Sequence, residues 1–122
     1  MHDIVDRLVS IKKEIQSNNS KAEIVAISKT FPINKILPLI NFGHVNFGEN
    51  KIQEAVEKWT DIKKDFNNIK LHFVGKLQSN KVKYALPLFD YIHSLDSIKL
   101  AEKIANEQQK KNLNQKFLFK LI

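Results

Sequence analysis

The sequence predicts an α/β fold in which parallel strands alternate with helices. Short apolar runs rich in β-branched and aromatic residues recur along the 122 residues, and stretches with helical spacing of apolar residues separate them. Helices of this length between strands imply right-handed crossovers and a parallel sheet. Two architectures fit this order, an open doubly wound sheet and part of a (β/α) barrel.

The first third of the chain is expected to contain a leading helix, a strand and a second helix. Residues 1–18 form an amphipathic helix because apolar residues recur there at helical spacing (Ile4, Leu8, Ile11 and Ile15). Residues 24–28, IVAIS, are an unbroken apolar run typical of a strand buried on both faces. The next helix begins at Pro32 and ends near Gly43, although Pro38 lies inside it and disfavours a straight helix.

The remaining elements continue the same alternation. Four apolar runs predict strands: HVNFG (44–48), LHFVG (71–75), YIHSL (91–95) and FLFKLI (117–122). Helical spacing predicts one helix over 52–62 and a shorter one over 78–88. A last helix carries Leu100 and Ile104 on one face, and Asp96 or Ser97 is its N-cap.

Composition narrows the functional classes. The chain has no cysteine, which excludes disulfides, thiolate catalysis and cysteine-bound zinc. Its net charge is +7, but the lysine pairs fall on different predicted helices without interleaved aromatic residues, so solvated helix faces are favoured over a nucleic-acid surface. No apolar run is long enough to span a bilayer, and we expect a cytoplasmic protein without a membrane partner.

The histidines and glycines of the sequence form no recognisable metal or nucleotide site. His44, His72 and His93 fall in three successive strand regions, but their spacing matches no metal-ligand motif, and structural roles are favoured. Neither GxGxxG nor a Walker A sequence is present, so nucleotide cofactors lack support.

Polar residues follow each predicted strand, where parallel α/β folds place ligand chemistry. Ser28, Lys29 and Thr30 come directly after the first strand. Lys29 has two interpretations. Its stem packs on the core while its ammonium reaches water, or its amine is a nucleophile that forms a Schiff base with an aldehyde.

Four segments resemble successive motifs of the pyridoxal phosphate homeostasis protein family, in the same order and with similar spacing. They are AISKTFP, FGENKIQEA, LHFVGKLQSNK and IHSLDS. The resemblance runs from about Val25 to the end of the chain. It implies that residues 1–122 are the N-terminal part of a TIM-type barrel like that of alanine racemase, with about five of eight strands. It also implies that Lys29 holds pyridoxal 5'-phosphate as a Schiff base.

The same resemblance suggests further site residues. Asn50 would face the cofactor ring or its lysine, and a helix cap is an equally favoured alternative. His72 and Ser94 resemble the family's strand residues beneath the ring. The family's later segments, which include its phosphate-binding loops and an arginine that faces the pyridine nitrogen, have no counterpart in these residues.

The family's role implies a non-catalytic protein that binds pyridoxal phosphate in vitamin B6 and amino-acid homeostasis. A racemase-like enzyme is one alternative, disfavoured because no following β domain supplies a second catalytic base. A truncated fragment that no longer binds the cofactor is another. We also expect self-association through the incomplete edge of the barrel.

Overall fold

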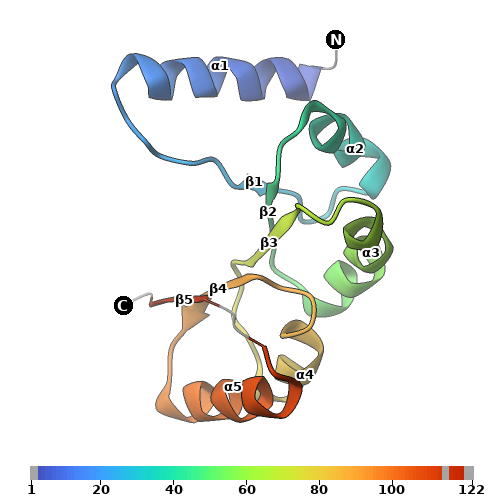
Figure 1. Ribbon diagram of the computed structural model, residues 1–122, viewed down its shortest axis with the longest axis vertical. Coiled ribbons are helices and arrows are strands. Elements are labelled where there is room, and N and C mark those ends of the chain that lie inside the picture. Colours follow the sequence, from blue (N-terminus) through green and yellow to red (C-terminus); the bar gives the residue numbers. More distant parts are fainter. Residues whose placement is uncertain (1–2, 114–115, 120–122) are drawn as a thin grey trace.

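The fold is a five-stranded parallel sheet with helices along one side. The computed structural model describes residues 3–113 and 116–119, with the backbone alone at Ser94 and 116–119. The strands follow the order β1-β2-β3-β4-β5, and every neighbouring pair is parallel. Helices α2, α3, α4 and α5 lie on the same side of the curved sheet, and α1 lies across the end beside α2 (Figure 1).

This arrangement decides between the two predicted architectures. A doubly wound sheet carries helices on both faces and reverses its strand order at a switch point. Here the strands are consecutive, and the helices that connect them form a single outer layer (Figure 1). The predicted (β/α) units of a TIM-type barrel, with five of eight strands, are therefore confirmed.

The helices and strands have the following bounds. The helices are α1 (Asp3–Ser17), α2 (Ile33–Phe42), α3 (Ile52–Asp65), α4 (Val82–Ala85) and α5 (Ile98–Lys111), with a 3₁₀ turn, η1 (Ser79–Lys81), before α4. The strands are β1 (Ala26–Ile27), β2 (Asn46–Glu49), β3 (Lys70–Phe73), β4 (Tyr91–Leu95) and β5 (Lys116–Phe119). Residues 120–122 of the last predicted strand lie outside the described residues.

Helix ends follow the predicted signals closely. Pro32 is the N-cap of α2, Gly43 ends the helix with a left-handed φ of 103°, and Pro38 is accommodated inside it. Of the two candidate caps for α5, Ser97 holds the position, and its Oγ accepts the backbone N–H of Leu100 at 3.1 Å. These local signals depend on neighbouring residues alone, which is why they can be recognised in the sequence.

Two predicted elements differ from the observed ones. The segment 24–28 forms only the two-residue strand β1, and Ile27 is 46% exposed rather than buried on both faces. The reason is that Ile27 is paired with Gly48 and lies with it on the face of the sheet that the helices do not cover. The helix predicted over 78–88 is broken into η1 and the single turn α4.

The hydrophobic core lies between the sheet and its outer helices. Phe47 of β2 packs against Trp59 of α3 with ring centroids 5.0 Å apart, and Phe73 of β3 meets Phe89 edge to face at 5.2 Å. Because side chains alternate along a strand, the neighbours Gly48 and His72 lie on the opposite, inner face. The outer face of the sheet therefore holds the fold together, and the inner face is left for other contacts.

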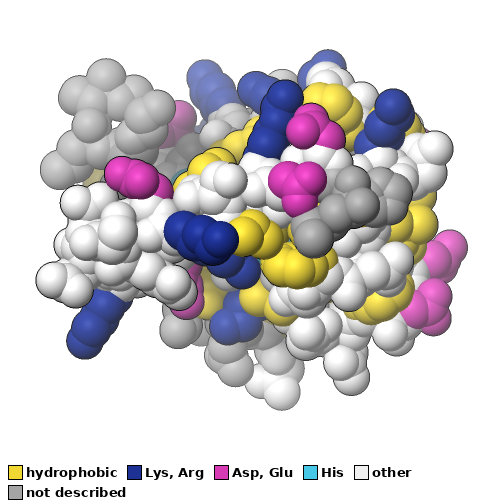
Figure 2. All heavy atoms as spheres, turned by 90° about the horizontal axis from the view of Figure 1, so that it is seen from above, with side chains coloured by type: hydrophobic (Ala, Val, Ile, Leu, Met, Phe, Trp, Pro, Cys, Tyr) yellow, Lys and Arg dark blue, Asp and Glu magenta, His cyan; other side chains and the backbone are white. Residues whose placement is uncertain are grey.

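Charged side chains are dispersed over the end of the molecule that carries α1. Seen from that end, lysine and arginine side chains are scattered among acidic and apolar ones and do not gather in one patch (Figure 2). None of the helices in the described part of the chain is both long and apolar enough to cross a membrane.

Candidate functional site

Lys29 lies in a tight turn directly after β1, at the carboxyl end of the sheet. The backbone N–H of Phe31 donates to the carbonyl of Ser28 at 3.2 Å and closes the turn. Thr30 has a left-handed φ of 67°. The side chain of Lys29 is exposed, and no described residue makes a hydrogen bond or ion pair with it. Its amine is therefore accessible at the edge where the sequence predicted it.

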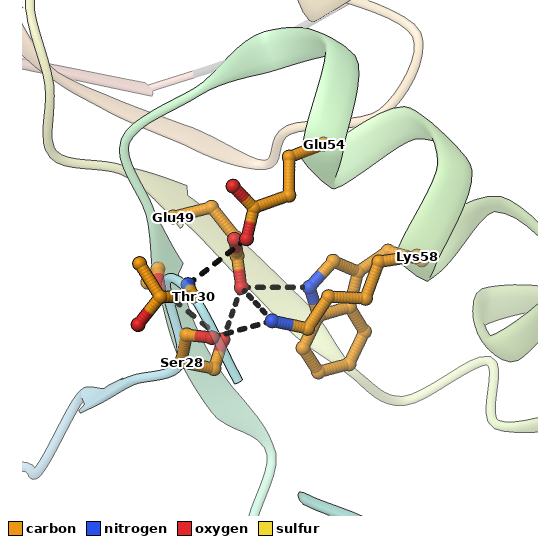
Figure 3. Close-up of polar contacts among 7 residues, drawn as sticks. Ser28, Thr30, Glu49, Glu54 and Lys58 are labelled. Atoms are coloured by element: carbon orange, nitrogen blue, oxygen red, sulfur yellow. Dashed lines mark hydrogen bonds and ion pairs between the residues drawn. The ribbon is translucent and has the colours of Figure 1, made fainter. Parts of the chain in front are cut away.

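The backbone on both sides of Lys29 is held by α3 (Figure 3). Before it, the buried Ser28 donates its N–H to the carbonyl of Gly48 at 2.9 Å, and its own carbonyl accepts from the ammonium of Lys58. After it, the N–H of Thr30 donates to Oε1 of Glu54 at 2.9 Å. Lys29 thus extends from a fixed turn.

A buried carboxylate, Glu49, joins these contacts. Its side chain is 1% exposed, and its Oε2 accepts from the ammonium of Lys58 at 2.9 Å, from Nε1 of Trp59 at 3.1 Å and from Oγ of Ser28. The other oxygen, Oε1, has no hydrogen-bond partner within the described residues. A buried carboxylate without several donors would be very costly, so the donors around Oε2 explain its position.

The sequence predicts neither Glu54 nor Lys58 as a site residue, and it marks Glu49 only as one of the polar residues that follow the second strand. One signal was available, because Glu54 and Lys58 are four residues apart and therefore share one face of α3. The contact of this face with the turn after β1 is tertiary, and no spacing in the sequence reports it. Glu49 and its neighbour Gly48 on β2 point to opposite faces of the sheet. Only the structure shows that Glu49 is the one that faces α3.

Asn50 follows β2 and is half-buried close to the loop after β3. A Cβ at Gly75 would lie 2.6 Å from the carbonyl oxygen of Asn50, so the two loops can approach only because Gly75 has no side chain. The N-cap position of α3 is Lys51, which makes no side-chain cap hydrogen bond. Asn50 is therefore not the helix cap that the sequence offered as its alternative role.

His72 lies on the inner face in a chain of polar side chains that spans three strands. Its Nε2 is 3.0 Å from Oδ1 of Asn46 on β2, and its Nδ1 is 2.9 Å from Nε2 of His93 on β4. Since the amide oxygen only accepts, His72 donates to Asn46 and accepts the N–H of His93. Tyr91 stacks on the same ring with centroids 4.4 Å apart.

The imidazoles of His72 and His93 are both neutral near pH 7. Burial, reinforced by the neighbouring His93, lowers the pKa of His72 to about 4, and burial also lowers the pKa of His93. The pair fits the predicted structural role of the histidines, although its link to Asn46 was not foreseen. Within residues 3–113 and 116–119, no group of three or more metal-ligating side chains occurs.

The four predicted site residues belong to four neighbouring strands of the sheet. Lys29 and Asn50 follow β1 and β2 at their carboxyl ends, and His72 is the penultimate residue of β3. Ser94 belongs to β4, where the pairing with β5 is irregular between Ile92 and Leu95, and its side chain lies outside the description. The carboxyl end of the sheet and the adjoining inner face thus combine an accessible amine, an amide and neutral imidazoles.

Comparison with known proteins shows which sequences and structures the chain is similar to. No family model matches the chain. The pyridoxal phosphate homeostasis protein of Haemophilus influenzae is 38% identical over 109 residues, which are 89% of this chain and 46% of that protein. The protein of the same name from Buchnera aphidicola subsp. Schizaphis graminum is 37% identical over 128 residues, covering 99% of this chain and 56% of the relative. The chain is similar to pyridoxal phosphate homeostasis proteins along nearly its whole length.

Solved structures agree with this assignment. PipY of Synechococcus elongatus, determined without pyridoxal phosphate, superposes with a TM-score of 0.86 at 34% identity and covers 94% of this chain and 52% of that one. PipY with pyridoxal phosphate bound superposes with a TM-score of 0.85. The chain spans about half the length of the relatives that it matches. The resemblance of its four motifs to this family is confirmed.

Proposed function

We propose that this chain binds pyridoxal 5'-phosphate through Lys29 and serves, without catalysis, in vitamin B6 and amino-acid homeostasis. The observation that carries the proposal is the position of Lys29, an accessible amine on a fixed turn at the carboxyl end of β1. The related PipY structure with the cofactor bound supports it. The aldehyde of pyridoxal phosphate condenses with a neutral lysine amine to form a Schiff base and releases water.

The residues at this edge fit the aldehyde end of the cofactor. Lys29 would supply the amine. Asn50, His72 and Ser94, from the neighbouring strands, would line the cofactor site. His72 and His93 lie on the inner face and are neutral. They therefore add no positive charge there that would attract the phosphate group of the cofactor. The sequence has one arginine, Arg7, which lies on α1 and pairs with Asp3 at 3.4 Å.

A labelling experiment tests the proposal. The purified chain is incubated with pyridoxal phosphate, its visible absorption is recorded, and sodium borohydride then reduces the Schiff base to a stable amine that peptide mapping locates. We expect an absorption band that Lys29→Ala abolishes and label concentrated on Lys29. Lys13→Ala, which removes an exposed lysine of α1, is the matched control and should retain both. A chain without a band at saturating cofactor would favour the fragment alternative.

Catalysis is a separate question for the same preparation. Racemisation requires proton transfer on both faces of the substrate and hence two bases. Among the predicted site residues, Lys29 is the one amine, and the imidazole of His72 is already hydrogen-bonded to that of His93. We expect no racemisation of amino acids by a chain that carries label on Lys29, and turnover would favour the racemase-like alternative.

We also propose that the 122-residue chain self-associates through the incomplete edge of the barrel, at the edge strand β1 and the inner face beside it. Ile27 and Val74 are 46% and 37% exposed there, and both lie against Gly48. Exposed apolar groups beside an unpaired edge strand favour association. Sedimentation velocity over a concentration series should show a species larger than the monomer. A single monomer boundary at high concentration would rule this out.

A further inference from the structure

We infer that α3 positions Lys29, with Glu54 and Lys58 holding the peptide groups on its two sides and Glu49 holding Lys58. The inference rests on the proposed function and assigns positioning residues to the same site. The described contacts of Glu49, Glu54 and Lys58 are made with the protein itself and not with the place of the cofactor. They act on the turn from which the reactive amine extends (Figure 3).

The first contact fixes the peptide group that precedes Lys29. The side chain of Lys58 is 7% exposed, and its ammonium donates to the carbonyl of Ser28 and to Glu49 at 2.9 Å. A buried ammonium requires partners of fixed geometry, because moving away from them leaves its charge unpaired. Lys58 is therefore held by Glu49, and the Ser28 carbonyl is held by Lys58.

The second contact fixes the peptide group that follows Lys29. Thr30 has a left-handed φ of 67°, a conformation that β-branched residues rarely adopt. Such a conformation persists where surrounding contacts compensate for its strain. The carboxylate of Glu54, which accepts the Thr30 N–H at 2.9 Å, is such a contact. The strained residue and its helix partner lie immediately beside the proposed attachment point.

Together these contacts fix the direction in which the Lys29 side chain leaves the backbone. The sequence contains nineteen lysines, and free amines of this kind share the same intrinsic chemistry. A fixed starting point limits the region that the amine of one of them, Lys29, can reach at the carboxyl end of the sheet. Orientation of a reacting group contributes strongly to its effective concentration, and a displacement of about 1 Å can cost on the order of 100-fold. The α3 contacts would therefore favour reaction at Lys29 over the other lysines.

The test compares three substitutions on α3. Glu54→Ala removes the acceptor of the Thr30 N–H, Glu54→Gln keeps an acceptor oxygen, and Glu57→Ala removes a carboxylate from an exposed position on the same helix. Each variant is labelled with pyridoxal phosphate and borohydride, and the share of label on Lys29 is measured against the other lysines. Thermal unfolding midpoints show whether each variant is folded.

We expect Glu54→Ala to lower the share of label on Lys29 by about tenfold, while Glu54→Gln and Glu57→Ala stay near the wild type. Hydrogen exchange gives a direct second measurement, because the Thr30 amide should be protected in the wild type and exposed in Glu54→Ala. Selective wild-type labelling that Glu54→Ala leaves unchanged would overturn the inference alone, as would equal Thr30 exchange in both proteins. Unselective labelling of the wild type would overturn the proposed function as well.

Discussion

Nδ1 of His72 lies 2.9 Å from Nε2 of His93, which joins β3 to β4 by a side-chain hydrogen bond on the inner face of the sheet. The same ring of His72 reaches Asn46 on β2. The neutral ring of His72 can donate to Asn46 and accept from His93, whereas a protonated ring would bring a positive charge into a partly buried position. Protonation therefore opposes the native arrangement.

Stability should accordingly fall in acid. Burial lowers the pKa of His72 from 6.5 to about 4, so the unfolded chain binds more protons between these values and the free energy of unfolding rises with pH. The contribution is fully present above pH 6.5 and is lost as the pH falls toward 4, by up to about 3 kcal/mol. Urea unfolding at a series of pH values checks this. His72→Gln should flatten the dependence, and an unchanged slope in that variant would contradict the assignment.

The buried pair of Lys58 and Glu49 should be sensitive to the loss of one partner. Lys58→Met leaves the Glu49 carboxylate buried without its cation, and we expect a loss of about 3–5 kcal/mol in the free energy of unfolding. The double variant Glu49→Gln/Lys58→Met removes both charges and keeps an oxygen for Trp59, so it should recover much of that loss. Denaturant midpoints measure both. A double variant less stable than the single one would contradict this account.

Two glycines should differ in their tolerance of a methyl group. In Gly75→Ala the new Cβ would lie 2.6 Å from the backbone oxygen of Asn50, which cannot move alone, and we expect a loss of about 1–3 kcal/mol. In Gly48→Ala the nearest atom, at 2.7 Å, is the end of the half-exposed Ile27 side chain, which can rotate away. Thermal melts should rank Gly75→Ala below Gly48→Ala, and the reverse order would refute the argument.

The N-terminus of α5 offers a matched pair of adjacent substitutions. Ser97→Ala removes the oxygen that accepts the Leu100 N–H and should cost about 1 kcal/mol. Asp96→Ala, at the exposed preceding residue, should change stability little. Equal losses in chemical denaturation would show that the cap hydrogen bond is not what stabilises this end.

Local and long-range information explain what the sequence could predict. Helical spacing identified α1, α3 and α5, and the alternation of strands and helices placed Lys29 directly after the first strand, where the structure has it. The exposure of Ile27 could not be foreseen, because an apolar run does not report whether its sheet neighbours cover both faces. Likewise the contacts of Glu49 with Lys58 and of Glu54 with Thr30 connect different units of the fold, and only folding brings them together.

The strictly consecutive order of the five strands also has a consequence for how the chain folds. Each strand pairs with the one synthesised just before it, so no strand waits for a distant partner. Pairing between strands that follow each other in the sequence costs less loop-closure entropy than pairing between distant strands would. The sheet can therefore grow one strand at a time as the chain leaves the ribosome, and the turn that carries Lys29 can be secured once α3 has emerged.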